Sequence, residues 1–148
     1  MTPLLYAARN GHAAIVQQLL TTGRINVNSR DIYNRTSVFC AAINGYITIS
    51  QHLLVTGKVE INSRDKFERT LLSYAAENGH TARAQELLAK WKIEVDPRDE
   101  DKRTPLSYAA GNGHTAIVQQ LRGFGAQLPI ITNARRERKG IFGLVRKS

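Results

Sequence analysis

Apolar residues near the start of the chain are spaced as they are on two short helices that follow one another. In the segment TPLLYAARNGH, Leu4 and Ala8 share one helix face, and Asn10-Gly11 then supplies residue types that tolerate a left-handed helix end. The next apolar stripe predicts a second helix, which stops at Gly23. We expect the members of this stripe to be buried; they are Ile15, Val16, Leu19 and Leu20.

Beyond Gly23 the helical spacing gives way to an alternation of apolar and polar residues, with Ile25 and Val27 as the apolar members. Such alternation is typical of extended backbone. The stretch then ends in the polar, turn-like run SRDIYNR. We therefore predict an extended finger that connects one helix pair with the next.

The whole pattern recurs along the chain with a constant period. Segments that begin at Thr2, Thr36, Thr70 and Thr104 align, and each starts 34 residues after the one before. A helix pair of this size cannot bury its apolar face alone, so such repeats stack and are stabilised by their neighbours. The predicted repeats are residues 2–35, 36–69, 70–103 and 104–131, which form one domain, 2–131, followed by a tail, 132–148.

The fourth repeat matches a known family motif, TPLHxAAxxGHxxIVxxLL. The matching residues are Thr104-Pro105-Leu106, Ala109-Ala110, Gly113-His114, Ile117-Val118 and Leu121. The chain therefore resembles ankyrin-repeat proteins over residues 2–128. This resemblance implies an all-α ankyrin-repeat solenoid of about four stacked helix–turn–helix units with extended fingers. The TPLSYAAxNGH motif also resembles the repeats in the long ankyrin arrays of filamentous-fungal, NOD-like receptor proteins.

Departures from the motif affect the local structure that we expect. The glycine of the family's fingertip turn is replaced by Asn34, Glu68 and Lys102, and Glu and Lys accept a positive φ less readily than Asn. We therefore expect the fingertip geometry at Glu68 and Lys102 to differ from that of the family's glycine turn. Trp91 replaces the glycine that ends the second helix elsewhere, and it either packs on its own repeat or is an exposed anchor. The His of TPLH is absent, which puts its usual hydrogen bond in question; its replacements are Leu5, Phe39, Ser73 and Ser107.

In this family, partner contacts usually come from the fingertips and from the exposed ends of the first helices, and the resemblance implies the same here. These positions vary between the repeats while the framework recurs, as expected when packing constrains only the framework. Tyr33 and Phe67 lie at equivalent places on successive fingers, and aromatic and arginine side chains are the usual interface anchors. The alternative, that both rings pack against adjacent fingers, stays open. The predicted partner-binding residues are Arg9, Ile32, Tyr33, Arg35, Ile43, Lys66, Phe67, Arg69, Glu77, Glu100, Asp101 and Arg103.

The composition argues against several other classes of protein. Of the 148 residues, 42% are hydrophobic and 22% are charged, which favours a single soluble folded unit. No apolar run approaches the roughly 20 residues that a membrane-spanning helix needs. The N-terminus lacks the pattern of a secretory signal, so we expect an intracellular location, cytoplasmic or nuclear. Because the chain starts almost on its first repeat, we also expect it to derive from a longer array.

Positive charge is concentrated at the C-terminus. The chain has 21 Lys and Arg residues against 12 Asp and Glu, a net charge of +9, of which residues 132–148 contribute +5. This tail is a candidate contact for nucleic acid or anionic lipid, or a nuclear-import signal. The alternatives are a solvated end and a segment that docks on the last repeat.

Titratable residues outside the fingertips predict neither catalysis nor metal binding. His12, His80 and His114 share one framework position with Tyr46, and tyrosine could not replace a metal ligand or a base there. Cys40 aligns with tyrosines of the other repeats, which indicates a partly buried helix residue. We expect two further features to be solvated: His52 on the second helix, and the self-neutralised cluster Asp99-Glu100-Asp101.

No phosphate-binding loop or zinc-ligand spacing is present in the sequence. The sequence therefore predicts a non-catalytic protein–protein interaction module without a cofactor, whose partner is an unidentified protein. Two other interpretations remain: contact with nucleic acid or an anionic membrane through residues 132–148, and a structural segment of a larger receptor.

Overall fold

The computed structural model describes residues 1–128, and these contain eight α-helices and no β-strand. The prediction of an all-α fold is confirmed. First and second helices alternate along the chain, as the repeat pattern predicts. The first helices are α1 (Pro3–Asn10), α3 (Ser37–Ile43), α5 (Leu71–Asn78) and α7 (Pro105–Gly111). The second helices are α2 (Ala13–Thr21), α4 (Ile47–Leu54), α6 (Thr81–Lys90) and α8 (Thr115–Gly123).

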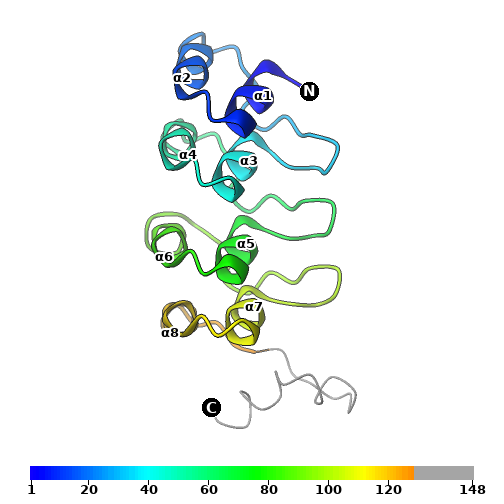
Figure 1. Cartoon of the computed structure of the whole chain (residues 1–148), viewed down its shortest axis with the longest axis vertical. Coiled ribbons are helices and arrows are strands. Elements are labelled where there is room, and N and C mark those ends of the chain that lie inside the picture. Colours follow the sequence, from blue (N-terminus) through cyan, green and yellow to red (C-terminus); the bar gives the residue numbers. More distant parts are fainter. Residues whose placement is uncertain (129–148) are drawn as a thin grey trace. The chain divides into compact units, whose positions relative to one another are not determined.

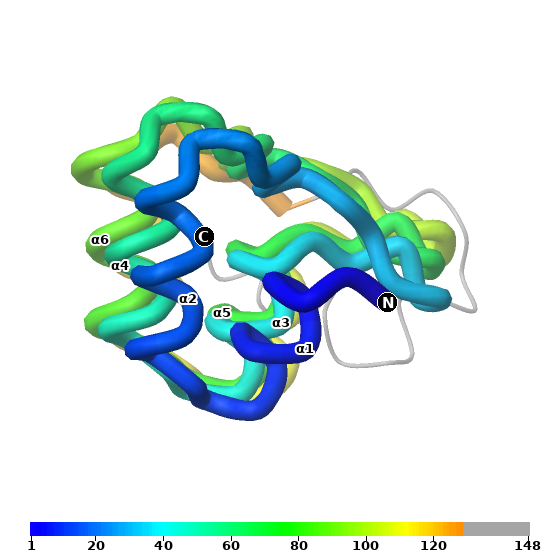
Figure 2. The backbone as a smooth tube through the Cα atoms, turned by 90° about the horizontal axis from the view of Figure 1, so that it is seen from above, coloured from blue at the N-terminus to red at the C-terminus, as the bar shows by residue number. Residues whose placement is uncertain are grey.

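The helices belong to two compact units, an N-terminal unit, Met1–Lys66, and a C-terminal unit that starts at Phe67. In the N-terminal unit α1 packs against α3, and α2 packs against α4. The C-terminal unit repeats this arrangement with α5 against α7 and α6 against α8. Within each unit the loops between repeats project away from the second helices, past the first helices, as Figures 1 and 2 show. We call these loops the first, second and third fingers, residues 24–35, 58–69 and 92–103.

A threonine begins every first helix. The Oγ1 atoms of Thr2, Thr36, Thr70 and Thr104 accept a hydrogen bond from the backbone amide three residues later, at 3.2–3.4 Å. Such caps each contribute about 1 kcal/mol. Although the TPLH histidine is absent, every first helix is therefore still capped at its start. In the fourth repeat Ser107 adds a second bond, because its Oγ accepts from the Thr104 amide at 2.8 Å.

The glycine-histidine motif serves packing between consecutive repeats. Gly11 and Gly79 end α1 and α5 with φ values of 80° and 72°, a conformation that suits glycine. A Cβ atom on Gly11 would lie 2.8 Å from the ring of Tyr46, and one on Gly79 would lie 2.7 Å from the ring of His114. The His114 Nε2 atom is also 3.0 Å from the Glu77 carbonyl oxygen. At the shared histidine-tyrosine position, Tyr46 and His114 thus pack on the glycine of the preceding repeat.

The second helix of the third repeat ends differently from the others. Gly23 and Gly57 follow their helices with φ values of 68° and 71°, whereas Trp91 ends α6 in an extended conformation with φ −124° and ψ 151°. Trp91 is half-buried, and its indole Nε1 is shielded from solvent. This burial supports the packing interpretation of Trp91 over that of an exposed anchor.

All three fingertips keep the left-handed turn residue, so the expectation of a different geometry at Glu68 and Lys102 is wrong. Asn34, Glu68 and Lys102 have φ values of 62°, 62° and 63°. In the first finger the Asp31 Oδ1 atom accepts hydrogen bonds from the amides two and four residues later, each at 2.9 Å. Asp99 makes the same pair of bonds in the third finger, at 2.9 and 2.8 Å. These bonds offset the roughly 1–2 kcal/mol that a left-handed residue other than glycine costs.

The predicted apolar stripe of α2 is only partly correct. Val16 is fully buried, but Leu19 and Leu20 are half-buried and the side chain of Ile15 is 46% exposed. The aligned residues of the second and fourth repeats, Ile49 and Ile117, are by contrast buried. Periodicity identifies the apolar face of a helix, but the neighbours of that helix decide how much of the face is covered.

Candidate protein-interaction surface

Six of the predicted partner-binding residues belong to the N-terminal unit, and we call them the N-terminal contact surface. Ile32 is 86% exposed at the tip of the first finger, and the neighbouring ring of Tyr33 is 42% exposed. Neither the side chain of Ile32 nor the ring of Tyr33 is therefore buried between fingers. Arg9 and Lys66 are exposed, while Arg35 and Ile43 are half-buried. The six residues are Arg9, Ile32, Tyr33, Arg35, Ile43 and Lys66.

Arg35 links the aromatic tip to the turn beneath it. Its guanidinium carbon lies 4.8 Å from the centroid of the Tyr33 ring, within the range of a cation–π contact. The same group bonds the Asp31 Oδ2 atom through Nε at 2.9 Å and Nη2 at 2.8 Å. Burial by itself would raise the pKa of Asp31, but hydrogen bonds from Arg35 and from the Tyr33 amide lower that pKa below its ordinary value. The Tyr33 ring is therefore held on a rigid support.

The second finger continues this support. The backbone amide of Lys66 donates to the Tyr33 carbonyl oxygen at 2.8 Å, so the two tips are joined through the main chain. On the first helices, Asn44 Nδ2 donates to the Arg9 carbonyl oxygen at 3.3 Å. The N-terminal contact surface is thus presented by backbone that is bonded from one repeat to the next.

Cys40 is a helix residue, as predicted, but it is fully buried where partial burial was expected. Its Sγ atom is 3.8 Å from the Asp31 Oδ2 atom. Burial raises the pKa of the thiol to about 11, although the nearby positive charges of Arg35 and Arg9 oppose the rise. The thiol is therefore protonated at neutral pH, and a protonated, buried thiol is a poor nucleophile.

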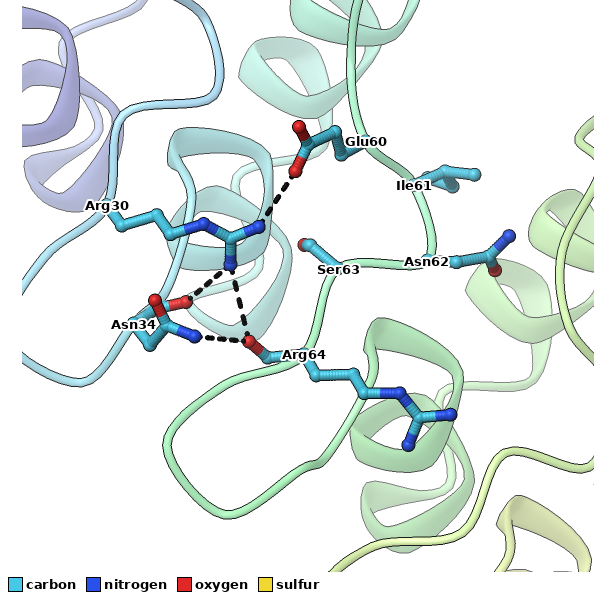
Figure 3. Close-up of a pocket in the computed structure, with 7 residues that line it drawn as sticks. All are labelled: Arg30, Asn34, Glu60, Ile61, Asn62, Ser63 and Arg64. Atoms are coloured by element: carbon cyan, nitrogen blue, oxygen red, sulfur yellow. Dashed lines mark hydrogen bonds and ion pairs between the residues drawn. The ribbon is translucent and has the colours of Figure 1, made fainter.

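A second set of contacts holds the first and second fingers together around a cavity of about 510 Å³, shown in Figure 3. Arg30 Nη2 pairs with Glu60 Oε2 at 2.8 Å, and Arg30 Nη1 donates to the Asn34 and Arg64 carbonyl oxygens at 3.1 and 3.4 Å. Asn34 Nδ2 reaches the same Arg64 oxygen at 3.1 Å. Ile61, Asn62 and Ser63 complete the lining. These interactions fix the spacing of the two fingers.

The sequence did not predict a role for Arg30 or for Asn28. Asn28 reinforces the connection between the two fingers. Its side chain donates to the Lys58 carbonyl oxygen at 2.8 Å and accepts from the Glu60 amide at 3.0 Å. The signal was present in the sequence, because the triplet Asn-Ser-Arg stands at 28–30 and again at 62–64. Residues that recur in register within a loop indicate a structural role for that loop.

The other six predicted residues belong to the C-terminal unit, and five of them surround one pocket of about 240 Å³. The Phe67 ring is 44% exposed, and its carbonyl oxygen accepts from the Glu100 amide at 3.2 Å. The buried carboxylate of Asp99 completes the lining. We call the following residues the C-terminal contact surface: Phe67, Arg69, Glu77, Glu100, Asp101 and Arg103.

Two arginines of this surface are held by tyrosine rings. The guanidinium carbon of Arg69 lies 4.0 Å from the Tyr74 ring centroid and 4.8 Å from that of Tyr108, and Arg69 also pairs with Glu77. The guanidinium carbon of Arg103 lies 4.8 Å from the centroid of the Tyr108 ring, and its Nη2 atom lies 2.9 Å from the Asp101 Oδ2 atom. Arg69 is therefore largely enclosed, and it supports the surface more than it extends from it.

Asp99 is the centre of the third fingertip, and the expectation that its cluster is solvated is wrong for this residue. Tyr108 donates its hydroxyl hydrogen to Asp99 Oδ2, and Arg103 Nε lies 3.3 Å from the same oxygen. Burial, followed by the bond to Asp99, raises the pKa of Tyr108 well above its ordinary value. Glu100 and Asp101 are exposed, as predicted for the rest of the cluster.

His52 also departs from the sequence expectation of a solvated side chain. It is half-buried and lines a shallow cavity of about 260 Å³ between α2 and α4, with its Nδ1 atom shielded from solvent.

Across the described part of the chain, no three His, Cys, Asp or Glu side chains are grouped so as to hold a metal ion. Among residues 1–128 no helix has the length and apolar character needed to cross a membrane. The basic tail, residues 132–148, lies outside the described residues.

Consecutive helix pairs with bonded fingers define an all-α repeat solenoid. A family model described as ankyrin repeats (3 copies) matches residues 1–65 and 41–130, which is most of the chain. The chain therefore belongs to the ankyrin-repeat family. Members of this family are generally protein–protein interaction modules and are typically non-catalytic. A comparison with curated proteins gave no match.

Proposed function

We propose that this chain binds a partner protein through the N-terminal and C-terminal contact surfaces, without catalysis. The observation that carries the proposal is the exposure of Ile32, Tyr33 and Phe67 on fingertips whose backbone is bonded from finger to finger, with the first fingertip also fixed by Asp31. Exposed aromatic groups on a rigid support lose little conformational freedom when a partner covers them. An intracellular location, cytoplasmic or nuclear, is part of this proposal.

The double variant Tyr33→Ala and Phe67→Ala tests the proposal. Immobilised full-length protein is exposed to a cell extract, and the captured proteins of the variant and the wild type are compared. We expect the variant to lose specific captured proteins while its thermal unfolding changes little, because both rings are partly solvated. The matched control is Val55→Ala with Phe124→Ala, which removes two exposed apolar side chains outside both contact surfaces. Equal capture by both double variants, or unfolding of the first, would contradict the proposal.

A second candidate function is contact with nucleic acid or anionic lipid through the tail, which the charge of +5 in residues 132–148 favours. We would replace Arg135, Arg136, Arg138 and Lys139 by Ser in the full chain. The wild type should bind duplex DNA or anionic vesicles with an affinity that falls as salt is added. The variant should bind both more weakly. Binding that is insensitive to salt, or unchanged in the variant, would exclude this function.

The TPLSYAAxNGH wording supports a third proposal, that the chain is a structural segment of a larger receptor related to the fungal NOD-like arrays. A nucleotide-binding domain encoded in the same reading frame would support this origin. A chain that captures partners by itself, through Tyr33 and Phe67, would argue against a purely structural role.

A further inference from the structure

The two contact surfaces carry charges of opposite sign. On the N-terminal contact surface three cationic side chains stand beside the two fingertip carboxylates of Asp31 and Asp65, for a net charge of +1. On the C-terminal contact surface Arg69 and Arg103 stand beside four carboxylates, for a net charge of −2. The four carboxylates belong to Glu77, Asp99, Glu100 and Asp101.

The reversal occurs at equivalent positions of the repeat. Lys66 and Glu100 lie 34 residues apart, each at the same place on a fingertip, and Arg9 and Glu77 occupy the same place on first helices two repeats apart. The reversal is therefore a property of the variable positions and not of the shared framework. Because opposite charges attract, the two surfaces favour partners of different charge.

Two of the three cations on the N-terminal contact surface are available to a partner. Arg35 is engaged by Asp31, but within residues 1–128 neither Arg9 nor Lys66 forms an ion pair, and both side chains are exposed. Arg9 is joined to the second repeat, because the Asn44 Nδ2 atom donates to the Arg9 carbonyl oxygen at 3.3 Å. Lys66 is joined to Tyr33 through its amide. Exposed apolar groups, Ile32 and Tyr33, thus share one surface with two unpaired cations.

We propose that the N-terminal contact surface binds an acidic segment of a partner protein that carries an aliphatic or aromatic side chain. The carboxylates pair with Arg9 and Lys66, and the apolar side chain packs on Ile32 and Tyr33. A nucleic acid fits less well, because its affinity comes from many phosphate contacts and this surface offers two free cations beside apolar groups. This inference rests on the proposed protein-binding function and specifies the chemistry of the partner.

The test uses the full chain, labelled with nitrogen-15, and two synthetic peptides of sequence EDEFDED and KRKFKRK. We expect EDEFDED to shift the amide resonances of Ile32, Tyr33 and Lys66, with an affinity that falls as salt is added. It should leave Glu100 and Asp101 unshifted, because that surface repels it. The peptide EDEADED, which lacks the ring, should bind more weakly.

Charge-reversal variants identify the residues responsible. Arg9→Glu with Lys66→Glu should weaken EDEFDED binding by about five- to tenfold, the range for two exposed ion pairs. The matched control, Arg24→Glu with Lys58→Glu, makes the same change of net charge at two exposed sites of the same unit outside the surface. Its effect should stay within about twofold.

Three results would overturn the inference: no shift of these amides by EDEFDED, an equal loss in both double variants, or tighter binding of KRKFKRK. Tighter binding of duplex DNA to the same amides would also overturn it, since the surface would then be a polyanion site. None of these results removes the protein-binding function, which the capture experiment with Tyr33→Ala and Phe67→Ala tests separately.

Discussion

The imidazole ring of His114 lies against Gly79, the residue that ends the first helix of the preceding repeat, so closely that a Cβ atom on Gly79 would be 2.7 Å from the His114 Cε1 atom. The same contact in the N-terminal unit joins Tyr46 and Gly11. Each glycine therefore meets two requirements, a left-handed backbone and space for a ring from the next repeat. These requirements can be separated experimentally.

Replacing Gly79 by Ala should destabilise the protein more than replacing Gly113 by Ala. The two glycines have similar φ values, 72° and 74°, but only Gly79 has a ring within 4 Å of the added methyl group. Both changes should cost about 1–2 kcal/mol for backbone strain, and Gly79→Ala about 1–3 kcal/mol more for the clash. Urea unfolding of both variants measures the difference. Equal losses would show that His114 moves aside without cost.

Lys102→Gly should stabilise the third finger. Lys102 has a φ of 63°, a conformation that glycine adopts without strain, so we expect a gain of up to about 1 kcal/mol. Glu100→Gly is the matched control at the same fingertip, where the backbone is not left-handed and glycine should destabilise. Thermal unfolding compares the two variants. A loss of stability in Lys102→Gly would mean that the Asp99 turn already removes the strain.

The stability of the N-terminal unit should depend on the ionisation of Asp31. Because the folded pKa of Asp31 lies below its ordinary value of 3.8, the stabilisation by its charged form is present above that value and is lost as the pH falls through the folded pKa. Asp31→Asn keeps the shape but lacks the charge that Arg35 binds. The free energy of unfolding should therefore differ between wild type and variant at about pH 7, and this difference should shrink at about pH 3. A constant difference would contradict the assignment.

Cys40 should react slowly with thiol reagents in the native protein. Its pKa is raised to about 11 by burial, so little thiolate exists at neutral pH. Reaction should accelerate sharply when urea unfolds the chain. A cysteine introduced at the exposed position of Val55 provides the control, and it should be modified rapidly in the folded state. Rapid modification of Cys40 in the native wild type would show that the first helices open readily.

Much of the fold was predictable from the sequence because the repeat shows each local rule four times. The threonine caps, the helix stops and the framework role of the histidines follow from residue types whose preferences act within a few neighbours along the chain. The fingertip turns were predicted wrongly. Their geometry depends on Asp31 and Asp99, whose side chains bond the following amides and so permit a lysine or glutamate where glycine is usual.

The positions of the candidate site residues in the sequence were predictable, but their contacts and burial were not. The sequence by itself determined the period, the helix pairs and the variable residues, because these depend on local backbone preference and on the spacing of apolar side chains. Only the tertiary structure decided that Arg69 is enclosed by two tyrosine rings, that Ile15 is left exposed, and that Arg30 joins two fingers. Burial and ion pairing depend on which side chains other repeats bring near, and a one-dimensional pattern does not contain those distances.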